Sequence, residues 1–190
     1  MYQICVSGAA KGPTVEAGHD LARQTGEAIA KGGHALLTGA TNGIALEAAK
    51  AYKRAGGKMS IGISPASSKI EHVMKYRLPS KPYDAIIYTG MHYAGRDAFL
   101  INSADAVISI GGRVGTLHEA TISIETGTPI GFLKGAGGTS ELIPNILKVA
   151  QEYENDEKIL YGNEPQSLLE QLVKFLDKEH KQYIRLYDQE

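Results

Sequence analysis

Several features that mark particular classes of protein are scarce in this chain of 190 residues. It has one cysteine and no tryptophan. A single thiol cannot form an internal disulfide, so a disulfide-stapled secreted scaffold is excluded, and Cys5 is interpreted as a buried, inert thiol within an apolar strand. No apolar run approaches the length of a membrane-spanning helix, so we expect no membrane partner. The chain begins directly with a strand-like segment rather than a signal peptide, and we expect a cytoplasmic location.

An excess of charge of either sign is also missing. Lys and Arg number 20 and Asp and Glu number 21, for a net charge of -1. Without a basic field or a basic stripe with interleaved aromatics, a nucleic-acid partner is not expected. The six histidines are scattered, and none has the spacing of a zinc site, so we expect neither a metal nor a cofactor.

Two common phosphate-binding motifs do not occur. No Gly-Lys-Ser or Gly-Lys-Thr follows a glycine run, which excludes a P-loop. Gly-x-Gly-x-x-Gly is absent after the first predicted strand, so binding of a dinucleotide in the usual Rossmann manner is unsupported.

What the chain does have is a regular alternation of strands and helices, with glycine after most of the strands. Strands are predicted at 2–7, 34–38, 58–64, 84–89, 104–109 and 129–133, with an edge strand at 158–161. Helices are predicted at 16–31, 44–54, 95–103, 117–126, 141–152 and 166–182. This order predicts an α/β fold with a doubly wound, mostly parallel sheet.

We expect one Rossmann-like, nucleotide-binding domain over 1–190, with its core in 2–150 and a C-terminal helix at 166–182. Residues 66–83 are polar and irregular, with two prolines. A stretch of that length in a compact domain is often a lid or a disordered loop, and the sequence leaves this open.

The stretch 110–119, Ile-Gly-Gly-Arg-Val-Gly-Thr-Leu-His-Glu, organises the rest of the chain. A buried strand that runs into a glycine turn and a helix N-terminus forms an anion site, because free N–H groups and the helix dipole point at negative charge. Glu119 would lie beside a phosphate bound there. The alternative is that Thr116 and Glu119 form a capping box that satisfies only the helix's own amides.

Other loops end at the same predicted sheet edge and contribute glycine, hydroxyl or charged groups. In an open parallel sheet, ligands bind at the C-terminal strand ends where the strand order reverses. The convergence of these loops predicts a nucleotide-sized pocket. The predicted phosphate- and substrate-binding residues are Ser7, Gly8, Gly39, Asn42, Gly43, Met91, Gly111, Gly112, Arg113, Val114, Gly115 and Thr116. His92 is a candidate rim contact, and His118 is expected at the surface or rim.

These residues carry a family resemblance. Residues 111–119 resemble the Pro-Gly-Gly-x-Gly-Thr-x-x-Glu signature of the "lonely guy" proteins, long misnamed lysine decarboxylases. Met91-His92-x-x-x-Arg96 resembles that family's Met-His-x-Arg-Lys segment, and the glycine-bounded elements in 32–65 agree as well. The resemblance covers residues 2 to about 150 and is specific at the level of the superfamily.

The resemblance implies a Rossmann-like homodimer that hydrolyses the N-glycosidic bond of nucleoside 5′-monophosphates to base and ribose 5-phosphate. It implies that the turn at 111–116 holds the 5′-phosphate and that Glu119 and Arg96 are catalytic. Elementary chemistry agrees, since a carboxylate stabilises an oxocarbenium-like sugar and an arginine recognises phosphate bidentately. No metal is needed.

Three positions depart from the family's pattern. Gly111 replaces a proline, Arg113 replaces a glycine, and Asp97 replaces the lysine after Arg96. Arg113 either adds a phosphate contact or obstructs the approach to the backbone. The departures resemble the related bacterial nucleotide-binding group that includes the molybdenum-cofactor carrier proteins, which implies a non-catalytic carrier or sensor of a phosphorylated nucleotide or pterin. A single-stranded-DNA binder like DNA-processing protein A, or a structural dimer with a vestigial rim, remain further alternatives.

Overall fold

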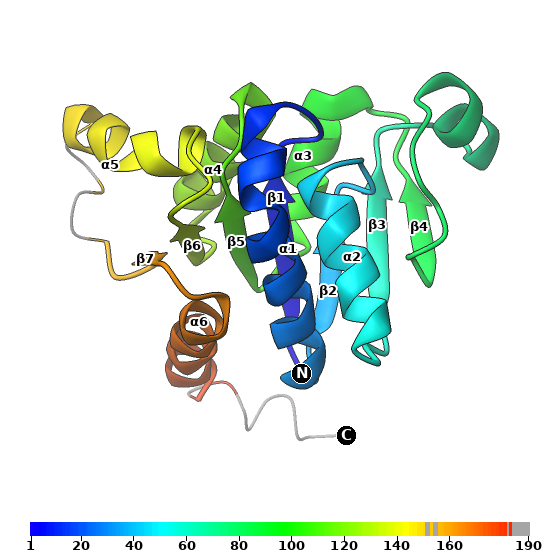
Figure 1. The fold of residues 1–190 in the computed structure, drawn as a ribbon. Coiled ribbons are helices and arrows are strands. Elements are labelled where there is room, and N and C mark those ends of the chain that lie inside the picture. Colours follow the sequence, from blue (N-terminus) through cyan, green and yellow to red (C-terminus); the bar gives the residue numbers. More distant parts are fainter. Residues whose placement is uncertain (151–152, 154–155, 182, 184–190) are drawn as a thin grey trace.

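One seven-stranded sheet forms the centre of the computed structural model, which describes residues 1–150, 153, 156–181 and 183 (Figure 1). The strands are β1 (Gln3–Gly8), β2 (Ala35–Thr38), β3 (Ser60–Ser64), β4 (Ala85–Tyr88), β5 (Ala106–Ile110), β6 (Ile130–Leu133) and β7 (Ile159–Gly162). The helices are α1 (Pro13–Lys31), α2 (Ile44–Arg54), α3 (His92–Asn102), α4 (Val114–Thr126), α5 (Thr139–Ala150) and α6 (Pro165–His180), with a five-residue π-helix, η1 (Glu71–Lys75).

The strand order is β4-β3-β2-β1-β5-β6-β7, and every neighbouring pair is parallel. The predicted α/β Rossmann-like fold is therefore confirmed. From β1 to β4 each successive strand is added on one side of β1, and from β5 to β7 each is added on the other side. The direction in which strands are added therefore reverses between β1 and β5. Such a reversal leaves a crevice at the C-terminal strand ends, because the loops that follow the two strands diverge to opposite faces.

Helices cover both faces of the sheet and divide the core into two layers. Packed against one face are α1, α2 and α6, and against the other α3, α4 and α5 (Figure 1). Strand β1 contributes to both layers, since Ile4 and Val6 point into the first and Cys5 into the second. All five residues of β5 are buried. A strand that is buried on both faces is a continuous run of apolar residues, without alternation of apolar and polar positions. This is why the strands could be recognised as apolar runs in the sequence.

Two helices next to the crevice begin earlier than predicted. Helix α4 begins at Val114 instead of 117, and α3 begins at His92 instead of 95. Helix α1 likewise begins at Pro13, with proline in the first turn, where its missing N–H has no helical partner to lose. The expected ends of two helices, at 151–152 and at 182, lie outside the described residues.

Residues 66–83 are irregular apart from η1, but their middle is anchored. The imidazole of His72 is fully buried, with Nδ1 2.8 Å from Ser64 Oγ and Nε2 3.0 Å from the Pro79 carbonyl. Glu71 accepts hydrogen bonds from the amide and the hydroxyl of Ser67, both at 2.6 Å. A role for this segment as a lid stays a prediction.

The contact between α1 and α2 depends on small residues. The α2 face toward α1 is rich in buried alanine, and a Cβ on Gly26 would lie 2.2 Å from the Ala48 carbonyl oxygen. Because that neighbour is backbone, it cannot swing away. Helices α1 and α2 are therefore so close at Gly26 that a larger residue there would clash with the α2 backbone.

We predict that Gly26→Ala destabilises the protein by about 1–3 kcal/mol through overpacking. In an unconstrained helix the same change would stabilise by about 1 kcal/mol, so the sign alone distinguishes the two cases. Urea denaturation measures the effect. Gln24→Ala, at an exposed position of the same helix, is the control and should stay close to wild type; a stabilised Gly26→Ala protein would contradict the packing described.

Candidate functional site

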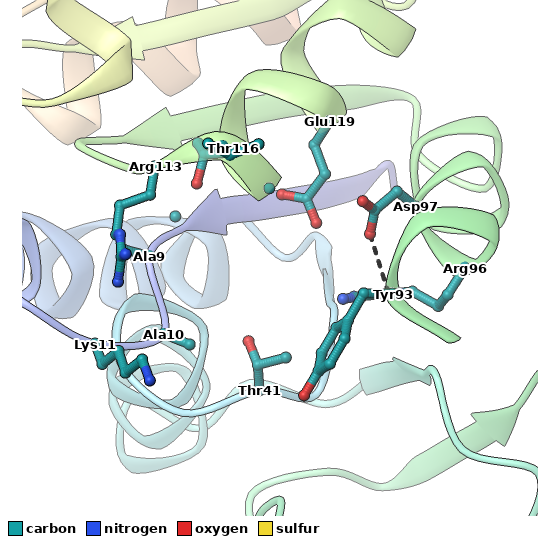
Figure 2. Close-up of a pocket in the computed structure, with 13 residues that line it drawn as sticks. Ala9, Ala10, Lys11, Thr41, Tyr93, Arg96, Asp97, Arg113, Thr116 and Glu119 are labelled. Carbon is teal, nitrogen blue, oxygen red and sulfur yellow. Dashed lines mark ion pairs between the residues drawn. The ribbon is translucent and has the colours of Figure 1, made fainter. Parts of the chain in front are cut away.

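A cavity of about 340 Å³ opens at the C-terminal ends of β1 and β5 (Figure 2). Its volume is within the range of small-molecule sites. Its lining comes from the loop after β1, from α3, and from the N-terminal turns of α4. The lining residues are Gly8, Ala9, Ala10, Lys11, Thr41, Tyr93, Arg96, Asp97, Arg113, Val114, Gly115, Thr116 and Glu119.

The first turn of α4 presents unpaired backbone N–H groups to this cavity. Arg113 precedes the helix in an extended conformation, and no side chain caps it. Leu117 is the first residue whose amide bonds back, to the Arg113 carbonyl at 2.9 Å. The amides of Val114, Gly115 and Thr116 have no acceptor within the described residues. Unpaired amides at a helix N-terminus attract negative charge.

The capping-box alternative for Thr116 and Glu119 is wrong. Thr116 is the third residue of α4 rather than its cap, and Glu119 is the sixth. The carboxylate accepts a hydrogen bond from the Ser7 hydroxyl on β1, not from an amide of its own helix. The sequence pattern misled because it could not show that the helix begins at Val114.

Two glycines shape the turn that leads into α4. Gly111 and Gly112 have φ of 58° and 105°, a region that L side chains rarely adopt. Their carbonyls accept hydrogen bonds from the first turn of α5, with Ser140 N–H 2.9 Å from Gly111 O and Thr139 N–H 3.3 Å from Gly112 O. A Cβ on Gly112 would lie 2.4 Å from Thr116 Cβ. The turn is therefore fixed against α5 while its open side faces the cavity.

Glu119 is a carboxyl group inside the protein. It is only 8% exposed, and its one described hydrogen bond comes from Ser7. Burial raises its pKa to about 7; the Arg96 guanidinium opposes that shift and the nearby Asp97 adds to it. A carboxyl group with a pKa near neutrality can both hold and release a proton at physiological pH.

Arg96 brings a guanidinium into the same place with hydrogen-bonding capacity to spare. It is 3% exposed, yet Nε and Nη1 have no hydrogen-bond acceptor within the described residues. Gly39 makes room for it, since a Cβ there would lie 1.7 Å from Nη1. Buried donors without partners are costly, and a ligand that supplies acceptors relieves that cost.

Asp97 is the second buried carboxyl of the cavity and is 4% exposed. Its Oδ1 lies 3.2 Å from Arg96 Nε, in an ion pair that lacks the alignment of a hydrogen bond, and its Oδ2 lies 2.9 Å from His118 Nδ1. His118 is itself exposed at the protein surface. The aspartate therefore joins the buried guanidinium to a histidine that solvent can reach.

The cavity is polarised from one end to the other. Figure 2 shows Arg113 and Lys11 together at one end, beside the first turn of α4, with Glu119 and Asp97 farther along. Tyr93 and Thr41 line the wall opposite the carboxyl groups. The arrangement places cations and free amides at one end, carboxyl groups in the middle, and an aromatic ring beside them.

The structure brings together seven of the fourteen residues predicted for the site: Gly8, Arg96, Arg113, Val114, Gly115, Thr116 and Glu119 line the cavity. The other seven lie around it. Ser7 holds Glu119, Gly39 accommodates Arg96, Gly43 packs under the backbone of Ala9 and Ala10, and Gly111 and Gly112 form the turn. Asn42 faces the Arg77 carbonyl at 3.5 Å, and Met91 packs beside Gly95.

Sequence reasoning missed six lining residues. Ala9, Ala10 and Lys11 directly follow β1, so the switch-point rule applied to that loop could have found them. Thr41 offered no distinctive signal. Tyr93 was missed because the sequence predicts that α3 begins only at residue 95. Asp97 was missed because its position matters in the sequence only as the loss of a lysine. His92 does not line the cavity; its Nδ1 lies 2.8 Å from the Tyr76 hydroxyl.

Two further properties concern the described residues only. No helix among them combines the length and apolarity needed to cross a membrane. They also contain no group of three or more His, Cys, Asp or Glu side chains arranged to hold a metal ion.

The match to known families follows this geometry. The model of the SLOG cluster4 family matches residues 1–169. The chain belongs to the SLOG cluster4 family. An uncharacterized protein of Archaeoglobus fulgidus is 34% identical to this SLOG chain over 134 residues, which are 70% of the chain and 81% of the relative.

Solved structures share the fold of this SLOG cluster4 chain. The structural-genomics target TM1055 matches with a TM-score of 0.76 and 23% identity, over 94% of the chain and 99% of the target. The molybdenum cofactor carrier protein of Chlamydomonas reinhardtii matches with a TM-score of 0.73 and 26% identity, over 92% and 97%. DNA processing protein A of Helicobacter pylori matches more distantly, with a TM-score of 0.60 and 16% identity, over 92% and 81%.

We predict that Glu119 makes the stability of the protein depend on pH. Its pKa is about 7 when folded against a reference of 4.5, so the native state holds the proton more tightly. The contribution is complete below pH 4.5, is lost as the pH rises to about 7, and then stays constant. The size is on the order of 3 kcal/mol.

Glu119→Gln removes this titration. The difference in free energy of unfolding between Glu119→Gln and wild type should therefore grow in favour of the variant from pH 5 to pH 8, as measured by urea denaturation. Glu125→Gln, on the exposed side of the same helix, is the control and should parallel wild type. A difference that does not change with pH would show that Glu119 titrates normally.

Proposed function

We propose that this protein binds a phosphorylated nucleotide or pterin ligand, with the phosphate against the first turn of α4. The observation that carries the proposal is the buried Arg96, whose Nε and Nη1 lack acceptors while the guanidinium lines the cavity. A buried cation with unused donors lines the same cavity as three free helix amides, and such a lining is matched by an anion with several acceptor oxygens.

The rest of the cavity fits the rest of such a ligand. Lys11 and Arg113 add positive charge at the open end, where a phosphate dianion would remain partly in water. Tyr93 lines the wall with its ring about half exposed, and an aromatic ring of this kind stacks on a planar base. Arg113 leaves the turn open, so we assign it a phosphate contact rather than an obstruction.

We further propose that the protein hydrolyses the N-glycosidic bond of nucleoside 5′-monophosphates, releasing base and ribose 5-phosphate. The supporting observation is that Glu119 faces the cavity and is not engaged by its own helix. A phosphate at the α4 turn would place the sugar and its bond to the base beside this carboxyl group, which could then take part in breaking that bond. Arg96 would hold the ligand in that position.

A carrier of a phosphorylated cofactor is the second candidate. It is favoured by likeness to proteins described as molybdenum cofactor carriers, one at 26% identity over 92% of the chain. In that case the same phosphate site would hold the ligand and Glu119 would contribute only binding. The chain also resembles DNA processing protein A, at 16% identity. A net charge of -1 does not favour binding of single-stranded DNA.

A homodimer is implied by the family resemblance and remains a prediction. The apolar residues of α4 mostly pack within the chain: Ala120 and Ile124 are buried, and Leu117 and Ile122 lie against the same core cluster. Sedimentation equilibrium tests the oligomeric state directly.

We predict that ribose 5-phosphate and AMP raise the melting temperature, since a ligand that binds only the native state stabilises it. Arg96→Ala should weaken binding at least tenfold, because a charge-assisted contact contributes about 1.5–3 kcal/mol. Arg113→Ala should weaken it less. Calorimetric titration measures both, and Arg54→Ala, an exposed arginine outside the cavity, is the control. Unchanged affinity in Arg96→Ala would refute the assigned phosphate site.

We predict that wild-type protein releases free base from AMP or another nucleoside monophosphate, and that Glu119→Gln lowers kcat by about 100-fold or more while still binding the ligand. Chromatographic detection of base and calorimetric binding are run on the same samples, with Glu125→Gln as the active control. Tight binding without hydrolysis by wild type across the common nucleoside monophosphates would eliminate the hydrolase and leave the carrier.

A further inference from the structure

The two buried carboxyl groups of the cavity have different partners. We propose that they divide the work of breaking the N-glycosidic bond: Glu119 is the proton donor to the leaving base, and Asp97 is the fixed negative charge that stabilises the sugar cation. This inference rests on the proposed hydrolase function and adds Asp97 to its catalytic residues. The family resemblance offers no precedent at that position, since the resembling motif has lysine there.

Asp97 has the contacts of an ionised carboxylate. Each of its oxygens faces a nitrogen, with Arg96 Nε 3.2 Å from Oδ1 and His118 Nδ1 2.9 Å from Oδ2. The dashed line in Figure 2 marks the pair with Arg96. The side chain is 4% exposed, and a nitrogen against each oxygen is the arrangement of charge-assisted contacts to a carboxylate.

Glu119 has the contacts of a neutral acid. It forms no ion pair within the described residues, and one hydroxyl, from Ser7, is its hydrogen-bond partner there. The charged and titratable groups around it are Cys5 on β1, Arg96 and Asp97 on α3, and His118 on α4. Arg96 is already neutralised by Asp97, so the desolvated Glu119 carries no dedicated counter-ion. Burial accordingly holds its pKa at about 7, with Asp97 adding to the rise.

Glycoside cleavage needs these two states together. One carboxyl group must donate a proton to the leaving group, and a second must stabilise positive charge on the sugar. A pair of acids whose surroundings push their ionisation apart supplies both at one pH. Both line the cavity that we assign to the nucleotide.

The step balances without a co-reactant other than water. The bond between C1′ and the base nitrogen breaks, and its electron pair stays with the base. The base takes a proton from the Glu119 carboxyl, and the sugar cation lies in the field of the Asp97 carboxylate. Water forms the new bond to C1′ and loses a proton to solvent at the open mouth of the cavity. Glu119 regains a proton from solvent.

The dependence of kcat/KM on pH tests this assignment, because it reports the ionisation of the free enzyme. Wild type should be most active below about pH 7 and lose activity above it, as Glu119 ionises. Asp97→Asn should lower kcat by about 100-fold, in the range for losing one electrostatic stabiliser, and should move the alkaline limb to lower pH. His118→Gln, which removes a group that lowers the pKa of Glu119, should move that limb to higher pH.

Controls show that the shifts in the pH profile come neither from a loss of structure nor from ionisation of the substrate. Glu125→Gln should reproduce the wild-type profile. The ionisation of AMP itself is the same for every variant, so a shift between variants reports the protein. Carbon-13 NMR of the glutamate carboxyls, assigned by Glu119→Gln, follows the titration of Glu119 directly and should show it ending at lower pH in Asp97→Asn.

The possible outcomes are distinct. Hydrolysis that rises through pH 7, or an alkaline limb unmoved in Asp97→Asn, overturns the division of roles and leaves the hydrolase intact. Complete absence of hydrolysis by wild type at every pH overturns both. Hydrolysis with the limbs displaced in opposite directions by Asp97→Asn and His118→Gln supports the assignment.

Discussion

The site depends on one guanidinium kept out of water with only part of its hydrogen-bonding capacity used. Arg96 is neutralised by Asp97 but leaves two N–H donors free, next to a carboxyl group that has no cation of its own. Burying polar groups in this way is unfavourable for the empty protein. The function that we propose uses this environment, because donors that are already in place can bind an anion with little reorganisation.

The fold creates this environment by its topology. The strand order reverses between β1 and β5, so Ser7 from one strand and the α4 turn from the next meet at one sheet edge. Helix α3, which packs beside α4 on the same face of the sheet, adds Arg96 and Asp97. Glycines allow the close approach, with Gly39 leaving space for the guanidinium and Gly112 for Thr116. Each element is supported by an extensive apolar layer beneath it.

Much of the fold could be predicted from the sequence because its signals are local. Apolar runs such as those of β1 and β5, glycines after the strands, and the spacing of apolar residues in the helices are each visible over a few residues. The helix starts at His92 and Val114 were missed because tertiary contacts, rather than capping side chains, determine them. That error concealed Tyr93 and led to the capping interpretation of Thr116.

The chemistry of the site was accessible only in part for a related reason. Glu119 and Arg96 belong to recognisable motifs, so residue type and spacing were enough to select them. Asp97 became significant through its distances to Arg96 and His118. Arg96 is its neighbour in the chain, but His118 lies beyond a strand and a turn. The hydrogen bond between Ser7 and Glu119 joins positions 112 residues apart in the chain. Motifs and periodicity extend over only a few residues, so they cannot predict such a contact.

A crystal structure of the protein with ribose 5-phosphate tests the central claim most directly. We predict phosphate oxygens within hydrogen-bonding distance of the amides of Gly115 and Thr116, with Arg96 in contact with the ligand and C1′ beside Glu119. A ligand bound with its phosphate away from the α4 turn, and Arg96 still without an acceptor, would contradict it.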